Sequence, residues 1–351
     1  MILYIGNKLS KHGVTPTNVE TLGAKLQEQF DTLLVSDKKN KIIRFFDAVF
    51  AIIRNRRKIS LVFIDTYSTS NFYYTLVAAL TCQLFKLPYV PILHGGGLPD
   101  RLKNSPGLCR MVFSKAAINI SPSHYLMDAF RKQGYEVEYI PNYIDTENYP
   151  SAVRRKLRPK LLYVRSLHKI YNPEMAVKAL KALSGDYPEI ELCMVGPDKD
   201  GSKASVEQLA ASLGVSDKLT LTGRLSKEAW IKLSDEYDVF INTTNFDNLP
   251  VSIIEAMCLG FPVVSTNAGG LPYLIEDQVD GMLVDLDDDQ AMVSCIKRLM
   301  EDAELAESIS KTAIEKGKSF DWERIRGQWD ALISRMALKE KLKASGSHEY
   351  I

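Results

Sequence analysis

Two carboxylates, Asp247 and Glu255, flank the start of a predicted short helix in a pattern suited to binding a phosphorylated ligand. An apolar run at 238–241 predicts a strand, and residues 252–259 predict a helix that Gly260 ends. The first amides of a helix lack intrahelical partners and carry partial positive charge, which favours a diphosphate. Carboxylates commonly hold ribose hydroxyls. We therefore expect one carboxylate at a ribose and the other at the group beyond the phosphates.

A second apolar strand, predicted at 261–265, leads into a loop that contains Gly269 and Gly270. The whole segment 242–275 thus predicts a strand, a phosphate-sized loop, a helix, a strand and a glycine-rich loop. Such units build parallel α/β sheets, whose ligands bind at the carboxyl ends of the strands.

The stretch DNLPVSIIEAMCLGFPVVSTNAGG (residues 247–270) resembles the signature of family 4 glycosyltransferases, which are retaining sugar-nucleotide transferases of the GT-B fold. That signature has an acidic residue, seven residues, a Glu, Ala-Met, a Gly, Pro-Val-Val and a Gly pair. This chain departs from it at Asp247, where the family usually has Glu, and at Tyr273, where a further Glu commonly follows the glycines. Asp247 is one methylene shorter, so its contact with a donor sugar differs in reach.

The resemblance implies an α/β protein of the GT-B fold, with two facing Rossmann-like domains and an interdomain cleft. It assigns Glu255 to the ribose hydroxyls, and Asp247 to the donor sugar and the charge near the anomeric carbon. His94, Asp247 and Arg165 are the catalytic candidates. The expected donor-binding residues are Gly6, Gly13, Arg165, Lys169, Arg224, Asp247, Asn248, Leu249, Pro250, Val251 and Glu255.

The composition excludes several classes of protein. The chain has 351 residues, of which 46% are hydrophobic and 25% charged, as in an ordinary protein of two globular domains. A net charge of +1 gives no global bias toward nucleic acid or membrane. The five cysteines are scattered without a CxxC pair, which favours free thiols, a reducing compartment and no structural zinc. The N-terminus has no cationic leader, so we expect a cytoplasmic protein.

The first domain is predicted to begin with a strand at 1–5, a loop at 6–15 and a helix at 18–30. The loop lacks GxGxxG, which argues against a dinucleotide fold of the oxidoreductase kind. Gly6, Gly13, Thr15 and Thr17 are candidates for the region under the donor diphosphate. An ordinary surface loop is the equal alternative.

Residues 38–58 predict a helix with two interpretations. Apolar side chains repeat at helical spacing and both ends are basic. The helix could pack its apolar face on the sheet, or it could lie on an anionic membrane surface. Related enzymes that extend lipid-linked glycans at the inner leaflet keep the second interpretation open.

Two further strand ends carry polar residues in the first domain. A strand at 61–64 ends at Asp65, and a strand at 88–93 ends at His94 and three glycines. By resemblance, His94 faces the donor sugar and the reacting centre, whereas the alternative is a polar strand end with a flexible loop. Asp65, Gly96 and Arg101 are the acceptor-side candidates. For Arg101, with Asp100 and Lys103, a solvated loop is an equal alternative.

The second domain is predicted to begin with a strand at 160–164, followed by Arg165 and Lys169. Relatives carry Gly-Arg-Leu and a Lys here. The Arg and the Lys bind the leaving diphosphate. In this chain Arg165 comes one position early, Tyr171 stands near the place of the Lys, and Lys169 is the alternative cation. Arg224 follows a strand at 219–223, where the family reads the base through backbone groups. The aspartates 287–289 predict a solvated helix start.

These features divide the chain into an N-terminal, acceptor-side domain (1–150) and a nucleotide-sugar-binding domain (151–322). A polar linker is predicted at 146–159. A C-terminal helix (323–338) is expected to cross back onto the first domain, and residues 339–351 to form a mobile tail.

The predicted function is retaining, hexosyltransferase-type transfer of a sugar from a UDP- or GDP-sugar to a glycan acceptor in cell-surface polysaccharide biosynthesis. A lipid-linked acceptor and peripheral attachment to the inner face of the membrane are options within this prediction. No metal cofactor and no nucleic acid partner are expected. An epimerase on the same fold and a non-catalytic nucleotide-sugar-binding subunit are the alternatives.

Overall fold

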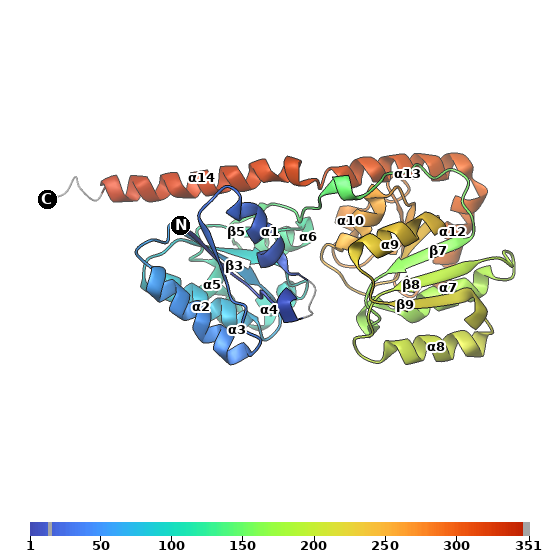
Figure 1. Ribbon diagram of the computed structural model, residues 1–351, viewed down its shortest axis with the longest axis horizontal. Helices are drawn as coiled ribbons and strands as arrows, with labels where there is room; N and C mark the ends of the chain where they lie inside the picture. Colours follow the sequence, from blue (N-terminus) through green and yellow to red (C-terminus); the bar gives the residue numbers. More distant parts are fainter. Residues whose placement is uncertain (13–15, 347–351) are drawn as a thin grey trace. The chain divides into compact units, whose positions relative to one another are not determined.

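The computed structural model describes residues 1–12 and 16–346, which form two compact units. Unit 1 comprises Met1–Pro141 and the chain from Arg326 onward, and unit 2 comprises Asn142–Ile325. Each unit has its own hydrophobic core. In both, helices lie on the two sides of a parallel sheet (Figure 1).

Unit 1 is built on a six-stranded sheet in the order β2-β1-β3-β4-β5-β6, and all neighbouring strands are parallel. The strands read as short apolar runs because both faces of a parallel sheet are covered. They are β1 (Ile2–Ile5), β2 (Thr32–Val35), β3 (Leu61–Thr66), β4 (Tyr89–Leu93), β5 (Asn119–Ser121) and β6 (Val137–Tyr139).

The helices of unit 1 follow the strands in the βα alternation that the sequence predicts. The hydroxyl of Ser123 accepts a hydrogen bond from the Leu126 N–H (3.2 Å) and caps α6, as its sequence position predicts. The helices are α1 (Asn18–Gln27), α2 (Lys41–Asn55), α3 (Phe72–Leu84), α4 (Leu98–Asn104), α5 (Pro106–Phe113) and α6 (His124–Arg131), with a 3₁₀ turn at Ser10–His12.

Unit 2 has a second six-stranded parallel sheet, in the order β12-β11-β10-β7-β8-β9. The chain therefore builds outward from β7 in one direction and from β10 in the other, the arrangement of a Rossmann fold. The strands are β7 (Lys160–Val164), β8 (Glu191–Val195), β9 (Leu219–Gly223), β10 (Val239–Asn242), β11 (Val263–Thr266) and β12 (Met282–Val284).

The helices of unit 2 also follow the predicted order. Asp288 caps α12 by accepting from the Ala291 N–H (2.8 Å), which confirms the helix start expected at the aspartates. The helices are α7 (Pro173–Leu183), α8 (Ser202–Leu213), α9 (Lys227–Leu233), α10 (Val251–Cys258), α11 (Leu271–Leu274), α12 (Asp289–Glu301) and α13 (Ala303–Lys318), with 3₁₀ turns at Thr146–Asn148, Lys169–Tyr171, Ser216–Lys218 and Ser234–Glu236.

Two segments differ from the sequence expectation. The loop considered for Asp100–Lys103 is the helix α4, because a proline follows its N-cap and suits the first turn. The last helix, α14 (Trp322–Gly346), does not end at Leu338 but continues through residues 339–346, whose Lys, Glu, Leu and Ala are good helix formers.

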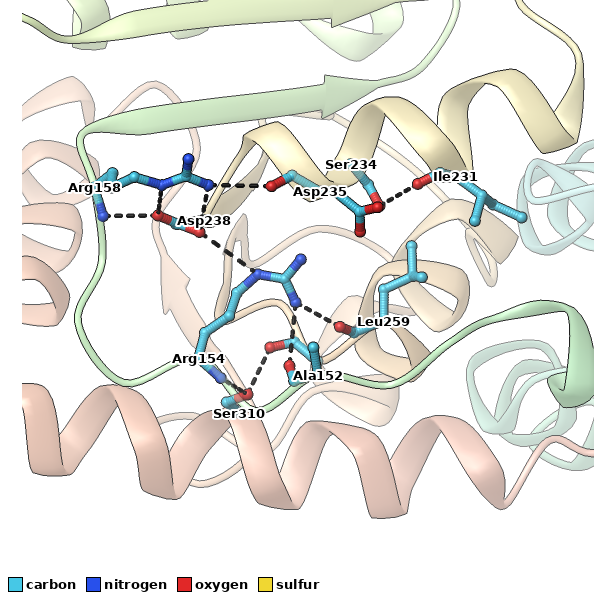
Figure 2. Close-up of polar contacts among 10 residues, drawn as sticks. Ala152, Arg154, Arg158, Ile231, Ser234, Asp235, Asp238, Leu259 and Ser310 are labelled. Carbon is cyan, nitrogen blue, oxygen red and sulfur yellow. Dashed lines mark hydrogen bonds and ion pairs between the residues drawn. The ribbon is translucent and has the colours of Figure 1, made fainter.

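The predicted linker 146–159 lies within unit 2, and its second half is fixed to that unit by side chains (Figure 2). Arg158 donates from its backbone N–H and its Nε to the carboxylate of Asp238, at 2.8 and 2.7 Å. The N–H of Arg154 donates to Ser310 Oγ at 2.9 Å. Composition alone does not reveal this anchoring, because exposed and buried arginines look alike in a sequence.

Candidate functional site

The main candidate site lies at the carboxyl ends of β7 and β10, which are neighbours in the sheet of unit 2. This is the point where the strand order reverses direction, and open α/β sheets bind their ligands there. Arg165 follows β7 directly, and Asp247 lies in the loop between β10 and α10. The strand order thus brings together two candidates that are 82 residues apart in the sequence.

Arg165 and Asp247 form an ion pair in which the guanidinium Nη2 donates to the Asp247 carboxylate. The guanidinium also lies over the ring of Tyr171, 4.3 Å from its centroid. Burial opposes the charge on Arg165, but Asp247 and the phenol of Tyr171 outweigh it and raise the pKa of Arg165. Burial raises the pKa of Asp247, and Arg165 opposes that rise. Arg165 is therefore a fixed cation at the sheet edge.

The glycine pair of the loop after β11, Gly269 and Gly270, supports the backbone that carries Asp247. The Gly270 N–H donates to the Asp247 carbonyl at 2.8 Å. A Cβ on Gly270 would lie 1.7 Å from the carbonyl oxygen of Asn248, and one on Gly269 would lie 2.2 Å from that of Asp247. The pair is thus required by a close approach of two loops, which also fixes the start of α10.

Helix α10 begins at Val251 with Pro250 as its N-cap, and no side chain caps it. The Pro250 carbonyl accepts from the Ile253 N–H at 3.1 Å. A proline cap has no side-chain acceptor for the first amides, so this helix start suits an external anion. Leu249 is half-buried and Asn248 is buried in the loop that leads into it.

Glu255, expected at the ribose, is 6% exposed and is held by two side chains that the sequence analysis did not identify. The Tyr149 hydroxyl donates to its Oε1 at 2.6 Å, and Lys227 Nζ lies 2.8 Å from the same oxygen. Burial and the charge of Glu255 raise the pKa of Tyr149, so the phenol remains a donor. Lys227 lies at the start of α9, and no sequence motif marks it as a partner of Glu255.

The other end of α10 is fixed by Arg154 (Figure 2). Its Nη1 donates to the Leu259 carbonyl, and its guanidinium lies 3.7 Å from the centroid of the Phe261 ring. Burial lowers the pKa of Arg154 to about 10, against the opposing charges of Asp238 and Asp235. A cation is favourable at the carboxyl end of a helix dipole. Arg154 therefore fixes the carboxyl end of α10, which is the end opposite the candidate anion site.

The remaining donor-site candidates of unit 2 are more peripheral. Lys169 is exposed on a 3₁₀ turn, and its backbone N–H donates to Asp200 at 3.0 Å. Arg224 is exposed directly after β9. Tyr171, rather than Lys169, is the residue of this turn that contacts the Arg165 guanidinium.

A second group of candidates lies in unit 1, around the ends of β1, β3 and β4. Asp65 is 2% exposed and accepts from the Tyr4 hydroxyl at 2.9 Å and from His94 Nε2 at 2.8 Å. Because a carboxylate only accepts, His94 carries its proton on Nε2 and leaves Nδ1 as the acceptor when neutral. Asp65, expected on the acceptor side, is buried and holds the ring of His94 through this hydrogen bond, and its contact with an acceptor stays a prediction.

Two candidate-loop glycines of unit 1 are required by close contacts within that unit. A Cβ on Gly6 would lie 2.6 Å from Asp65 Oδ2, and one on Gly95 would lie 2.4 Å from the Ser68 nitrogen. Gly6 therefore makes room for Asp65, and its place beneath a diphosphate stays a prediction. Gly96 is half-buried in the turn before α4. Gly13 and Thr15 lie outside the described residues.

Arg101 has a structural role that the sequence analysis did not anticipate. Its Nε donates to the Ser68 carbonyl at 2.7 Å, and its guanidinium lies 4.6 Å from the centroid of the Phe72 ring. These contacts tie α4 to the loop after β3. The acceptor contact expected for Arg101 stays a prediction.

The comparison with protein families matches Glycosyl transferases group 1 over residues 145–316, the segment that contains Arg165, Asp247 and Glu255. The matched segment spans just under half of the chain and comprises almost all of unit 2. The family match therefore falls on the unit whose strand order and helix start form the main candidate site.

Curated relatives agree with this assignment. The chain is 24% identical over 252 residues to a D-inositol 3-phosphate glycosyltransferase of Paenarthrobacter aurescens, an alignment that covers 66% of this chain and 60% of that protein. It is 31% identical over 153 residues to the sulfoquinovosyl transferase SQD2 of Arabidopsis thaliana, with 42% and 29% of the two chains covered. The chain thus matches less than two thirds of the length of either relative.

Solved structures show the fold of the whole chain. Alr3699/HepE of Anabaena, in complex with UDP and glucose, aligns with a TM-score of 0.75 at 18% identity and covers 95% of this chain and 99% of that one. A sucrose-phosphate synthase of Thermosynechococcus elongatus aligns with a TM-score of 0.69 at 18% identity, covering 87% and 81%. The chain has the two-domain α/β fold of GT-B glycosyltransferases, as the sequence signature predicts.

Proposed function

We propose that this protein is a retaining glycosyltransferase of the hexosyltransferase type, which transfers a sugar from a UDP- or GDP-sugar to a glycan acceptor. The observation that carries the proposal is the Arg165–Asp247 pair beside the uncapped start of α10, at the switch point of a Rossmann-type sheet. A cation and free helix amides at one strand edge suit a diphosphate, and a carboxylate beside them suits a sugar.

Each group of unit 2 has a role in this proposal. Arg165 and the amides at the start of α10 hold the diphosphate and stabilise the charge that grows on it as the glycosidic bond breaks. The buried Nε of Arg165 has no hydrogen-bond partner in the described structure, and a small shift toward a bound phosphate would supply one. Asp247 contacts the donor sugar. Glu255 takes the ribose hydroxyls, with Lys227 and Tyr149 fixing its carboxylate.

The proposed reaction proceeds on one face of the donor sugar. The acceptor hydroxyl oxygen forms a bond to the anomeric carbon as the bond from that carbon to the phosphate oxygen breaks. The acceptor proton passes to the leaving diphosphate, so the nucleoside diphosphate departs and the anomeric configuration is retained. His94, oriented by Asp65, is proposed to bind a sugar hydroxyl near the reacting carbon through its ring.

The acceptor is proposed to be a glycan of a cell-surface polysaccharide, with transfer on the cytoplasmic side of the membrane. The Paenarthrobacter and Arabidopsis relatives are named for different transfers, so the acceptor does not follow from similarity. We propose that the reaction needs no divalent ion, because the diphosphate charge would be met by Arg165 and the helix amides.

The proposal is tested in two steps. Thermal unfolding is first followed with UDP-glucose, UDP-galactose, UDP-N-acetylglucosamine and GDP-mannose, since a ligand that binds only the folded state raises the Tm. The stabilising donor is then incubated with a panel of glycan acceptors, with and without EDTA, and the linkage is read by ¹H NMR. Retained configuration with unchanged rate in EDTA is the expected result.

Other outcomes would replace the proposal. Conversion of the donor to an epimer without acceptor indicates an epimerase. Donor binding without hydrolysis or transfer over the whole panel indicates a non-catalytic binding subunit. If no nucleotide sugar changes the Tm, or if Arg165→Gln leaves the donor-induced shift intact, the site assignment is wrong.

A further inference from the structure

Helix α2 of unit 1 turns several of its large apolar side chains away from the protein. Ile42, Phe46 and Phe50 are 68%, 62% and 58% exposed, and Ile43 and Ile53 are also exposed. Residues 42, 46, 50 and 53 lie on one stripe of a helix because 3.6 residues make a turn. The interpretation of 38–58 as a helix that packs its apolar face on the sheet is therefore wrong for this face.

The face of α2 that packs on unit 1 is the less apolar one. Ala48, Ala51 and Ile52 are buried there, together with Arg44, whose Nη1 donates to the Lys38 carbonyl at 2.9 Å. Asp47 accepts a hydrogen bond from the Ser36 hydroxyl. A helix of an isolated globular unit normally shows the opposite arrangement, with its larger apolar residues inward. Within the described residues of unit 1, the exposed stripe is thus left uncovered.

The charges around the stripe are mostly basic, although Asp37 pairs with Lys38 at 3.2 Å. Arg54, Arg56, Arg57 and Lys58 are exposed at the carboxyl end of α2, and Lys38 and Lys39 precede its amino end. Asp47 is the acidic residue of α2, and it is engaged with Ser36. An apolar stripe between two basic ends complements a surface of acyl chains and anionic headgroups.

We propose that α2 docks unit 1 onto an anionic lipid bilayer, lying in the plane of the interface with Ile42, Phe46, Phe50 and Ile53 turned into it. A second copy of the chain fits less well, because a two-fold pairing of α2 would place basic ends against basic ends. The contact is interfacial, since none of the helices in the described part of the chain is long and apolar enough to cross a bilayer. The proposal stands on α2 alone and goes beyond the proposed transfer reaction.

The test uses the full chain and vesicle flotation. Vesicles of phosphatidylcholine alone are compared with vesicles that contain phosphatidylcholine and phosphatidylglycerol in about equal amounts. We expect flotation with the anionic vesicles, weaker flotation at high salt, and at least about tenfold weaker partitioning for the double variant Phe46→Ser/Phe50→Ser. The double variant Arg57→Gln/Lys58→Gln should lose part of the binding and part of its salt dependence.

The matched control is Leu338→Ser, which removes a leucine that is 58% exposed on α14. It should leave flotation unchanged. Because the substituted phenylalanines are exposed, the Tm of the Phe46→Ser/Phe50→Ser variant should match that of the wild type, which separates lost docking from unfolding. Donor-induced Tm shifts should also be unchanged, so failure of this proposal is distinguishable from failure of the transferase proposal.

Three outcomes would overturn the proposal. Absence of flotation with anionic vesicles is one, and equal flotation of the α2 variant and the wild type is another. The third is a wild-type dimer in sedimentation equilibrium that the Phe46→Ser/Phe50→Ser variant converts to monomer, without vesicle binding by either. That result would assign the stripe to a second copy of the chain.

Discussion

At the scale of single residues, Arg165 and Asp247 form a charged pair at the carboxyl ends of β7 and β10 in unit 2. Each side chain is largely removed from water, and each is stabilised by the other. Removing one partner of such a pair leaves an uncompensated charge, which costs about 3–5 kcal/mol. The pair therefore contributes to the folded state and, in our proposal, to donor binding.

Arg165→Gln should lower kcat for transfer by about 100-fold or more, because a cation that stabilises the leaving diphosphate is lost. It should also lower the free energy of unfolding, because the buried Asp247 carboxylate loses its partner cation. The measurements are steady-state kinetics and urea unfolding. Lys178→Gln is the control, because Lys178 is an exposed cation on α7 that pairs with Asp289 at 3.6 Å. Equal kinetic effects of the two changes would contradict a specific role for Arg165.

Asp65→Asn should lower the free energy of unfolding by about 1–3 kcal/mol, because the buried carboxylate accepts from both Tyr4 and His94. It should also lower kcat, since His94 loses the group that fixes its tautomer. Urea unfolding and kinetics measure the two effects. Asp31→Asn, at an exposed acidic position of unit 1, should change the unfolding energy by no more than about 0.5 kcal/mol. Unchanged activity of Asp65→Asn would show that His94 orientation is unimportant.

Among the elements, α10 is fixed at both ends by contacts from other parts of unit 2. Gly270 holds the loop that enters it, and Arg154 binds the carbonyl of Leu259 at its exit. Between these ends Glu255 is held by Tyr149 and Lys227. The first amides of α10 thus occupy a fixed position, which an anion site needs because preorganised donors cost no rearrangement on binding.

Arg154→Gln should destabilise the protein by about 2–4 kcal/mol, because the Leu259 carbonyl loses its charged donor and keeps the Ala152 N–H at 3.4 Å, and Asp238 loses a nearby cation. The adjacent Arg155→Gln should cost less than about 1 kcal/mol, since that side chain is 60% exposed and pairs with Glu307 at 3.2 Å. Urea unfolding of the two variants measures the difference. Equal losses would mean that the buried network of Figure 2 contributes little to stability.

The whole molecule carries five cysteines, all of them free thiols, and Cys295 is the one that is not fully buried. Burial raises the pKa of Cys82 and Cys258 to about 12 and that of Cys109 to about 11. A raised pKa means less thiolate at a given pH. The folded protein should therefore present few reactive thiols near neutrality.

Near pH 8, the native protein should react with DTNB at Cys295 at most, and all five thiols should react in denaturant. With iodoacetamide in place of DTNB, which hydroxide cleaves, labelling of the folded protein should increase only toward pH 11–12, where the buried thiols ionise. Mass spectrometry of the labelled peptides identifies the sites. Rapid labelling of Cys258 in the native protein would show that α10 opens locally.

Local features of the chain were predictable because they depend on neighbouring residues. The apolar runs predict the strands, Ser123 and Asp288 predict helix starts, and the signature 247–270 predicts the loop, helix and glycine turn of the candidate donor site. The amphipathic segment 38–58 is likewise a helix. These follow from backbone preference and side-chain periodicity, which act over a few residues.

The tertiary structure alone decided which side chains meet. Asp65 proved to orient His94, Arg101 to anchor a loop, Lys227 to reach Glu255, and α2 to turn its phenylalanines outward. Each depends on strand order and helix rotation, which bring together residues far apart in the chain. Periodicity tells which residues share a face of a helix, but only packing decides whether that face meets the protein or its surroundings.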